Sequence, residues 1–550
     1  MFKKINKYLN DENKFNKVDL ITIIVIIILY SILSFYKLGS NIAPNTFERF
    51  KKDERILIEL TEPDDIIQFK LFNGEQNSNF QIFISSDNTN YEYSHNYIGN
   101  GALSWDIIKP KVKGKYILII FNEDSTLGEI ALYNNSKEKI KIDNISYNAE
   151  QIKKLTDEQD TIPKKVSYMN SSYFDEVYFA RTAYEYVENI PTYEWTHPPL
   201  GKIIQAIPMF ITRHLSPFNY RLMGNISGII MLIIMYLFGK ELFKKRKYGI
   251  FASLLMFFDT FHFVQTRMGT VDSHLVLFMM ISVLGMIKYC NNKKILNLLI
   301  SGIFFGLAVC VKWTGLYCGL GLAIIYFTYM LKNKEFNLKH ILYGAGFFVL
   351  IPLIFYIGVY FLFPNNNINY TNNFKSIINQ QEAMYNYHSK LEAEHFFSSE
   401  WYTWPISYKP VWYHQVIIDN NTKETISGLG NIIIWWMGIF AMIYLLAKTI
   451  LKKDKSSFYI LILILSLWLP YVFIGRIMFL YHYFPVTPFM MLAIVGLFKD
   501  LTEKLKLKYI IPIYLVFVIA FFIIYYPVIT GNAVSLDYLD KIQLFNSWYF

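Results

Sequence analysis

Long apolar segments recur along this chain of 550 residues, and they constrain its fold more than any other feature. A helix needs about 20 predominantly apolar residues to cross a bilayer. Charged residues make up only 17% of the chain, whereas soluble globular chains average about 25%. We therefore expect a polytopic α-helical membrane protein. The eleven predicted spans are 18–38, 222–239, 248–264, 272–289, 295–311, 314–331, 341–363, 430–450, 457–475, 479–498 and 509–529.

Lysine and arginine are unevenly distributed between the two sides that the spans define. Basic residues favour the cytoplasmic side of a membrane, and here they gather in 1–17, 240–247, 288–294, 332–340, 448–456 and 499–508. The short connections of the other side, with the C-terminal tail, hold only Arg267, Lys312, Arg476 and Lys541. This pattern predicts a multi-pass protein of the plasma membrane with a cytoplasmic N-terminus and an extracytoplasmic C-terminus. Most of the net charge of +10 is then topological, so membrane lipids are expected partners and nucleic acid is not.

Two extracytoplasmic segments are too long to be simple connections. In the first, short apolar and polar runs alternate, as in residues 80–85 and 116–121, which predicts an antiparallel β-sandwich. The expected parts of the chain are 1–40 with the first span, 45–150 as the inserted β-sandwich, 165–363 with an acidic pair and spans two to seven, 364–429 as the second outer loop, and 430–550 with the last four spans.

The predicted β-sandwich has a loose resemblance of its own. Residues 80–88, 114–120 and 128–133, together with Trp105, look like a discoidin-type, galactose-binding-like module. The resemblance implies either a carbohydrate ligand in the cell envelope or a spacer that packs on the membrane domain. Both interpretations stay open, because such folds often carry no ligand site.

An acidic pair and a proline turn follow the β-sandwich. Asp175 and Glu176 lie among aromatic residues, where a partly desolvated carboxylate can act as a general base towards a hydroxyl. Pro198 and Pro199 stop a helix and fix a turn, which could aim His197 or Lys202 at a site. Taken alone, the acidic pair is equally typical of a helix N-terminus, and the proline turn of the entry to a helix.

Four cations break the scarcity of positive charge at the outer ends of the spans: Arg221, Arg267, Lys312 and Arg476. Ionisable residues at such depth are costly and often functional. Together they suit a phosphate, since Arg offers paired donors and Lys a point charge, although each could instead extend to the lipid headgroups.

Several aromatic residues and histidines accompany these cations. His482 stands between two tyrosines and could be a satisfied interfacial histidine or a donor to a phosphate. Trp195, Trp401 and Trp404 suit an aromatic belt at the membrane surface or platforms for a sugar ring. His274 and Trp548 are interpreted as structural.

Seven strings, in order along the chain, resemble the protein O-mannosyltransferase family, a group of GT-C-type glycosyltransferases. They are Phe-Asp-Glu at 174–176, His-Pro-Pro-Leu-Gly-Lys at 197–202, Tyr-Arg-Leu at 220–222, the Gln…Arg…Asp segment at 265–272, Lys-Trp-Thr-Gly at 312–315, the His…Trp…Trp-Pro segment at 394–405 and the Arg…Phe-Leu-Tyr-His-Tyr-Phe-Pro segment at 475–485. The topology places all of them on the outer side, as a single membrane-surface site requires. The shortness of 364–429, where eukaryotic members carry a β-trefoil module, resembles a bacterial-type member.

The resemblance implies a reaction and roles for these residues. Mannose would pass from a polyprenyl-phosphate donor to Ser or Thr hydroxyls of an acceptor protein, with inversion. Asp175 would be the base, with Glu176 orienting a substrate. Donor-binding residues would be Arg221, Arg267, Lys312, Arg476 and His482. Residues that position acceptor or sugar would be His197, Lys202, His395, Trp401 and Trp404. No cofactor is expected, and no metal-ligand pattern is seen, including at the three cysteines.

The sequence leaves three other functions to compare. A related transferase could decorate a glycolipid or a wall polymer with the same lipid-phosphate chemistry. A transporter is disfavoured, because transporters place charges near the bilayer midplane and show paired repeats. A sensor with a sugar-binding outer domain would need a cytoplasmic output module, and every predicted inner loop is short.

Overall fold

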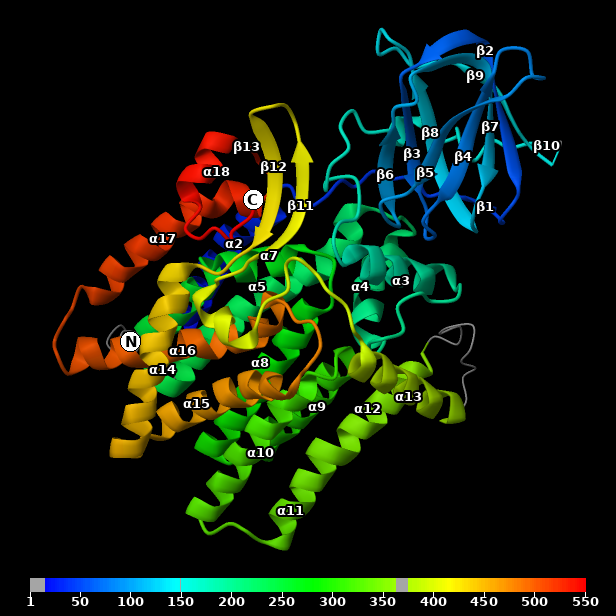
Figure 1. Ribbon diagram of the computed structural model, residues 1–550. Helices are drawn as coiled ribbons and strands as arrows, with labels where there is room; N and C mark the ends of the chain where they lie inside the picture. The colour runs from blue at the N-terminus through cyan, green and yellow to red at the C-terminus, as the bar shows by residue number, and fades with distance from the viewer. Residues whose placement is uncertain (1–14, 149, 363–373) are drawn as a thin grey trace. The chain divides into compact units, whose positions relative to one another are not determined.

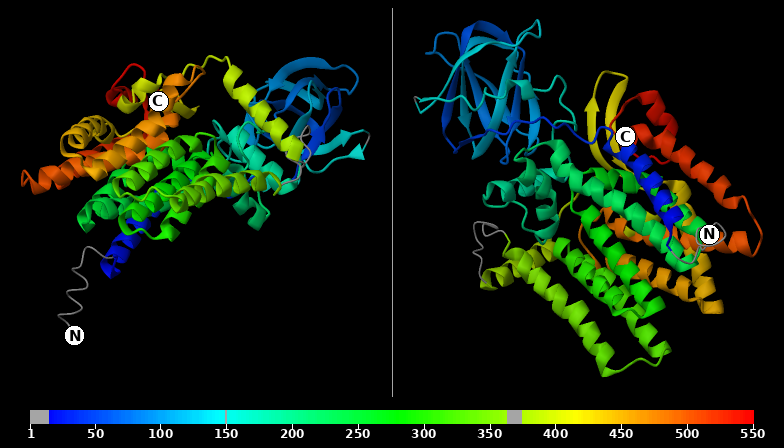
Figure 2. Two further views of the ribbon diagram at one scale, coloured as in Figure 1. Left: turned by 90° about the horizontal axis from the view of Figure 1, so that it is seen from below. Right: turned by 180° about the vertical axis from the view of Figure 1, so that it is seen from behind.

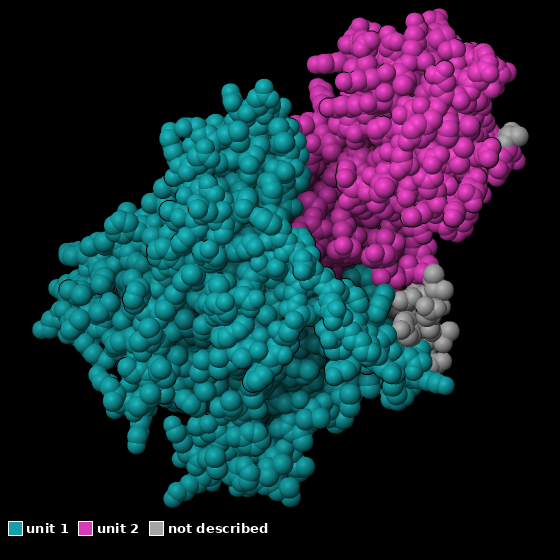
Figure 3. Space-filling model, viewed as in Figure 1, with its two compact units in different colours: residues 1–36, 194–204, 223–550 teal, residues 37–193, 205–222 magenta. Residues whose placement is uncertain are grey.

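The computed structural model describes residues 15–148, 150–362 and 374–550 (Figure 1). Residues 1–14 of the predicted inner segment and the start of the second outer loop therefore lie outside the described residues. The chain forms two compact units, coloured separately in Figure 3. Unit 1 comprises residues 1–36, 194–204 and 223–550, and unit 2 comprises 37–193 and 205–222.

Unit 2 contains a sandwich of two antiparallel sheets. One sheet has the order β1-β8-β3-β6 and the other β10-β9-β2-β7-β4-β5. The strands are β1 (Glu48–Phe50), β2 (Arg55–Ile66), β3 (Gln68–Asn73), β4 (Asn79–Ser85), β5 (Glu92–Ile98), β6 (Ser104–Ile108), β7 (Val112–Phe121), β8 (Ser125–Tyr133), β9 (Ile142–Tyr147) and β10 (Glu150–Gln151). The predicted β-sandwich is therefore present.

Alternation of apolar and polar residues explains the core of this sandwich. In β4, Phe80, Ile82 and Ile84 are buried, and the residues between them are more exposed. Side chains on a strand alternate between its two faces, so this pattern sends one face inward. The buried residues of both sheets form one apolar cluster, which includes Ile58, Phe121 and their neighbours.

The rest of unit 2 carries the acidic pair. Helix α3 (Glu176–Glu188) begins immediately after Asp175. The later parts of unit 2 are the second half of α4 (Leu200–Thr212) and the first turn and a half of α5 (Pro217–Phe243).

Membrane-spanning helices dominate unit 1. Within the described residues, nine helical segments are long and apolar enough to cross a membrane: Lys17–Phe35, Pro217–Phe243, Asp272–Asn292, Gly315–Lys332, Leu338–Tyr360, Ile432–Lys452, Lys455–Phe473, Leu480–Glu503 and Ile510–Ile529. They correspond to the helices labelled α2, α5, α8, α10, α11 with α12, α14, α15, α16 and α17 in Figure 1, and Figure 2 shows the same ribbon from two further sides. The protein is thus a polytopic helical membrane protein with a β-sandwich domain.

Two of the eleven predicted spans differ from this set. The span expected at 295–311 is α9 (Ile295–Val311), with the expected bounds but only 17 residues. The span expected at 248–264 is two helices, α6 (Arg246–Phe257) and α7 (Thr260–Arg267).

The break between α6 and α7 has a clear cause. The side chain of Asp259 accepts a hydrogen bond from the His262 amide (3.0 Å), and so caps α7. It also accepts bonds from the Asn431 amide (3.2 Å) and the Trp435 indole (2.9 Å). A buried carboxylate with donors from distant residues thus restarts the helix.

Shorter elements complete unit 1. Helix α13 (Phe374–Lys390) and a 3₁₀ segment (Trp401–Ile406) precede a hairpin of β11 (Val411–Ile417) and β12 (Thr422–Gly428), to which β13 (Ala533–Ser535) adds a third strand. Helix α18 (Leu536–Ile542) follows. Helix α8 and the segment Leu480–Glu503 are the most buried spans, each with 83% of its apolar window inside the protein.

Candidate functional site

Asp175 stands at the N-terminal end of α3 in unit 2. Its backbone carbonyl accepts the first helical bonds, from Tyr178 (3.1 Å) and Phe179 (3.0 Å), but its side chain makes no capping bond. The carboxylate is partly exposed. A helix N-terminus favours negative charge. Phe174, just before it, has φ of 50°, a left-handed conformation that costs a non-glycine residue free energy and is frequent at functional sites.

Glu176, next to it, has a different environment. Its carboxylate is fully buried and forms a two-pronged ion pair with Arg221, at 2.7 Å from both Nε and Nη2. The other donors of Arg221 reach three backbone carbonyls, those of Leu38 (3.0 Å), Tyr168 (2.8 Å) and Ser171 (3.0 Å). The guanidinium of Arg221 therefore donates all of these hydrogen bonds to residues of unit 2, and it holds the acidic loop in place. This arrangement favours a positioning role for Arg221 over the predicted contact with a phosphate.

The His-Pro-Pro turn lies in unit 1 and is held by a buried carboxylate. The Nδ1 atom of His197 lies 2.9 Å from Glu194 Oε1. Lys202 forms an ion pair with Glu194 and donates to the carbonyls of Glu194 (2.7 Å) and His197 (3.0 Å). The ammonium and His197 hold the pKa of Glu194 well below its usual range, against the opposing effect of burial. Lys202 is buried in this turn and positions His197.

A cavity of about 320 Å³ brings several predicted residues together within unit 1. Its lining includes His197, Lys312, Arg476, Trp313 and His388. They come from the turn before α4, the α9–α10 corner, α13 and the segment after α15. Two cations and two imidazoles facing one space can hold an anion and bind hydroxyl groups.

The two cations of this cavity differ in the contacts that their side chains make. Lys312 forms an ion pair with Asp272 at 3.0 Å, and both are nearly buried. The guanidinium of Arg476 has no hydrogen bond or ion pair with any residue in the described parts of the chain. Arg476 also lines a second cavity, of about 550 Å³, with Ser398, Ser399 and Glu400. It is the cation in this region best placed to accept a ligand.

Sequence reasoning missed His388. Its Nε2 donates to the carbonyl oxygen of Thr196 (2.8 Å). Its Nδ1 is buried and has no hydrogen-bond partner among the described residues. This atom is therefore an unused acceptor beside the cavity. No family-like string marks α13, so only the i, i+3, i+4 pattern of its buried side chains, including Ile377, Gln380 and Met384, could have drawn attention to it.

Protonation of His388 is expected to destabilise the native protein. Burial lowers its pKa to about 4, assisted by the charges of His197, Arg476 and Lys312. The unfolded imidazole has a pKa of about 6.5. Between these values the unfolded chain binds a proton that the native chain does not, so the free energy of unfolding falls as pH falls from about 6.5 to 4. The melting temperature in detergent should therefore drop less steeply over this range in His388→Asn than in the original protein.

A matched control is His395→Asn, at an exposed imidazole. Its melting curve should follow that of the unchanged protein at every pH. A difference between His388→Asn and the unchanged protein that stays constant from pH 7 to 4 would contradict the assignment.

Other predicted donor-binding residues make contacts within unit 1. Arg267 donates to the carbonyls of Ser34 (3.0 Å) and Tyr36 (2.7 Å) at the end of α2. His482 is buried, with Nδ1 3.0 Å from the Phe479 carbonyl and its ring stacked on Trp404 at 6.0 Å. Neither residue lines the cavity of Lys312 and Arg476.

The three predicted aromatic and histidine residues between 395 and 404 differ in how exposed they are. Trp404 is fully buried and donates to Ser399 Oγ (3.0 Å), so it belongs to the core around His482. Trp401 is partly exposed and packs edge-on against Trp468. His395 is exposed and packs against Phe479. Trp401 and His395 thus remain accessible to a substrate.

Among the described residues, one group of carboxylates has a spacing that could hold a metal ion: Glu129, Asp157 and Glu158 of unit 2, each with a carboxylate oxygen within 4.8 Å of the others. Burial raises the pKa of Glu129 to about 7. None of the three belongs to the predicted site.

Comparisons with known proteins match most of the chain. The family described as dolichyl-phosphate-mannose-protein mannosyltransferase matches residues 161–364, and the C-terminal four-transmembrane region of protein O-mannosyltransferase matches 373–548. The polyprenol-phosphate-mannose–protein mannosyltransferase of Mycolicibacterium smegmatis is 23% identical over 440 residues, which cover 66% of this chain and 84% of that protein. The protein of the same name from Corynebacterium glutamicum is 19% identical over 465 residues, covering 68% and 88%.

A solved structure has the same fold. The Saccharomyces cerevisiae protein O-mannosyltransferase Pmt1-Pmt2 complex bound to the sugar donor matches with a TM-score of 0.60 at 14% identity, covering 69% of this chain and 89% of that chain. The helical fold, the matched segments and the cationic cavity together define a polytopic membrane glycosyltransferase of the GT-C type. Within that class, the chain belongs to the protein O-mannosyltransferase family.

Proposed function

We propose that this protein transfers mannose from a polyprenyl-phosphate donor to Ser or Thr hydroxyls of proteins, on the outer face of the plasma membrane and with inversion at the anomeric carbon. Membership of the family supports the reaction, and the named relatives use polyprenol-phosphate-mannose and protein. The observation that carries the proposal is the cavity lined by both Lys312 and Arg476, in which the Arg476 guanidinium has no hydrogen bond or ion pair with a described residue.

The phosphate of the donor is the group that this cavity suits. Arg476 offers a planar fork of donors and Lys312 a point charge, which together neutralise the charge that grows on a leaving phosphate. Asp272 orients Lys312 through their 3.0 Å contact. Because the cations stabilise the leaving group, no acid is needed to protonate it.

The acceptor hydroxyl requires a base, and Asp175 is our candidate. Its carboxylate takes the hydroxyl proton while the oxygen attacks the anomeric carbon and the bond from that carbon to the phosphate oxygen breaks. Glu176 and Arg221 fix the loop that carries Asp175, as their buried ion pair suggests. Neither a cofactor nor a metal ion is assigned to this step.

Residues around the cavity would orient the sugar and the acceptor. The unused Nδ1 of His388 can accept a hydrogen bond from a hydroxyl, and His197 lies edge-on to it at 5.4 Å between ring centres. Trp401 and His395 are accessible for stacking or hydrogen bonding. Lys202, Arg267, His482 and Trp404 would act indirectly, by holding the backbone and rings that frame the site.

The test is transfer itself. Membranes containing the protein receive polyprenyl-phosphate mannose labelled in the sugar and a peptide rich in serine and threonine. Label should enter the peptide and be released by alkaline β-elimination, which cleaves O-linked sugars. Label found only in lipid or in wall polymer would favour the related transferase that acts on those acceptors.

Arg476→Gln is expected to weaken the donor specifically. Loss of a charge-assisted hydrogen bond of about 1.5–3 kcal/mol should raise KM for the lipid donor about 10- to 100-fold. Because the Arg476 guanidinium has no hydrogen-bond or ion-pair partner in the described parts of the chain, the variant should melt at the unchanged temperature. The measurement is initial rate against donor concentration in detergent micelles.

Two controls accompany this variant. Arg476→Lys keeps the charge and should recover part of the affinity, whereas Arg213→Gln, at an exposed arginine of unit 2, should change nothing. An unchanged KM for the donor in Arg476→Gln would refute the phosphate assignment.

We further propose an extracytoplasmic location and a carbohydrate ligand for the β-sandwich. The location is supported by the distribution of Lys and Arg along the sequence. A spacer role for the sandwich is the alternative, and its large cavity lined by lysines favours a ligand.

A further inference from the structure

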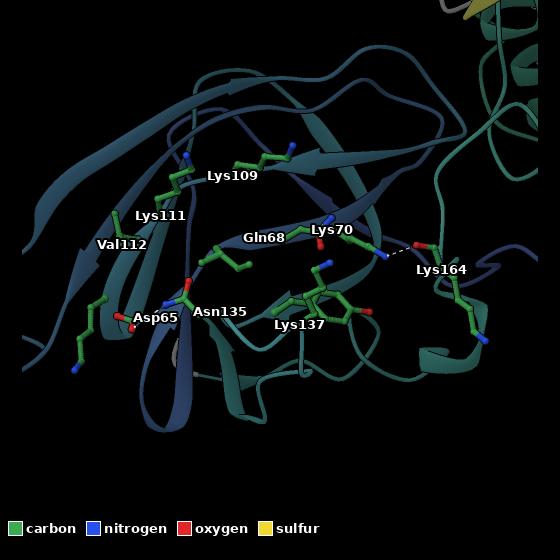
Figure 4. A pocket seen from close by; sticks show the side chains of 12 residues that line it. Asp65, Gln68, Lys70, Lys109, Lys111, Val112, Asn135, Lys137 and Lys164 are labelled. Atoms are coloured by element: carbon green, nitrogen blue, oxygen red, sulfur yellow. Dashed lines mark hydrogen bonds between the residues drawn. The ribbon is translucent and has the colours of Figure 1, made fainter. Parts of the chain in front are cut away.

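The β-sandwich of unit 2 has a cavity of about 900 Å³ at one end (Figure 4). The turn from β2 to β3, the β6–β7 loop and the chain after β8 form it. Its charged lining is six lysines and one carboxylate, that of Asp65. The lysines are Lys70, Lys109, Lys111, Lys113, Lys137 and Lys164.

Lys70 is the unusual member of this set. It lies on β3 and is only 5% exposed. Its ammonium donates to the carbonyls of Pro163 (2.8 Å) and Lys164 (3.2 Å) and lies 4.9 Å from the ring centre of Tyr133. Burial lowers its pKa. No carboxylate among the described residues pairs with it, and an uncompensated buried charge is costly.

The other lysines leave the positive charge unbalanced. Lys109, Lys111 and Lys137 are exposed, and none forms an ion pair with a described carboxylate. Asp65, the one acid of the lining, accepts a hydrogen bond from Asn135 (3.2 Å). In Figure 4, Lys137 extends towards Gln68 and Lys70 at the centre of the cavity. Six lysines clustered around a single carboxylate repel one another, so an anion that enters relieves the repulsion.

We propose that this cavity binds an anionic carbohydrate polymer, a chain of sugar or polyol units bearing phosphate groups. The lysines would take the phosphates, and the amides of Gln68 and Asn135 would bond to hydroxyls. A space of about 900 Å³ is far larger than one phosphate ion needs and is within the range of ligand sites. This deepens the carbohydrate ligand proposed for the sandwich and is independent of the transfer reaction.

The lining argues against a lipid surface as the ligand. Binding to a bilayer is strengthened by exposed apolar side chains that enter it. The large exposed apolar residues on the sandwich strands are Tyr93, Ile98 and Ile107, and none of them lines this cavity. The apolar lining residues Ile67 and Val112 are only partly exposed.

The test measures binding without transfer. The full chain, in nanodiscs of neutral phosphatidylcholine, is titrated with lipid-free poly(glycerol phosphate), with neutral dextran, and with vesicles containing phosphatidylglycerol. The variant is Lys109→Gln/Lys111→Gln/Lys137→Gln. Its matched control, with the same loss of three charges from the same sandwich, is Lys52→Gln/Lys141→Gln/Lys153→Gln, at exposed lysines outside the cavity.

The unchanged protein should bind poly(glycerol phosphate) and not dextran, with affinity that falls as salt is added. The cavity variant should bind at least tenfold more weakly, and the control variant within twofold of the unchanged protein. Equal binding by all three proteins, or equal loss in both variants, would overturn the cavity as the site. Binding to the anionic vesicles but not to the polymer would overturn the polymer as its ligand.

Mannosyl transfer to a short soluble peptide should be unchanged in both variants. Failure of the polymer to bind while transfer proceeds would therefore reject this inference and leave the transferase function standing. Binding of the polymer without any mannosyl transfer would support this inference and reject the transferase function.

Discussion

Replacing Asp175 by asparagine is expected to lower the rate of mannosyl transfer by about 10²- to 10⁴-fold, the usual contribution of a general base. Asn has nearly the same shape but cannot take a proton. Asp175 makes no side-chain capping bond to α3 and is partly exposed, so the variant should fold and bind donor normally. Single-turnover transfer from labelled donor to peptide, with donor binding measured separately, distinguishes lost chemistry from lost binding.

The same helix provides a control. Glu188→Gln, at the exposed far end of α3, removes one negative charge without touching the acidic loop. It should retain transfer within about twofold. Full activity in Asp175→Asn would remove Asp175 as the base and return attention to the imidazoles of the cavity.

Arg221→Met is expected to cost about 3–5 kcal/mol of stability, the loss usual when one partner of a buried ion pair is removed. Both groups are 0% exposed, so the Glu176 carboxylate would remain buried without its counter-charge. Three backbone carbonyls, those of Leu38, Tyr168 and Ser171, would also lose their donor. Denaturant or thermal unfolding in detergent, followed by loss of the monodisperse peak, measures the effect.

Lys541→Met is the matched comparison, since it breaks an ion pair with Asp537 in which both side chains are more than 70% exposed. Exposed pairs contribute little, so this variant should unfold like the unchanged protein. If Arg221→Met keeps its stability but loses donor affinity, then Arg221 contacts the donor phosphate, as the sequence predicted, and is not a positioning residue.

Local pattern was enough to predict most of the fold. Apolar segments of about 20 residues appear as helices close to the predicted bounds, because burial in a bilayer depends mainly on composition. Alternation in 80–85 and 116–121 identified β4 and β7, because successive side chains on a strand point to opposite faces of the sheet. The break at Asp259 was not predictable, since its partners Asn431 and Trp435 are distant in sequence.

The site was predictable only in part. Chain order and topology singled out His197, Lys312 and Arg476, and these three line one cavity. What sequence could not supply was the partner of each charged group. Arg221 and Lys202 look like ligands until their contacts with Glu176 and Glu194 are seen. His388 was not predicted, because the contact of its Nε2 with the Thr196 carbonyl, which holds the ring beside the cavity, joins residues far apart in sequence.

The split between α6 and α7 affects how the protein is made. Helices of 12 and 8 residues are about 18 and 12 Å long at 1.5 Å per residue, too short to cross a bilayer alone. The carboxylate between them is completed by Asn431 and Trp435. While the ribosome is still synthesising the middle of the chain, those donors do not exist. The bonds from Asn431 and Trp435 to Asp259 can therefore form only after the start of α14 has been translated, so the junction between α6 and α7 is completed late in synthesis.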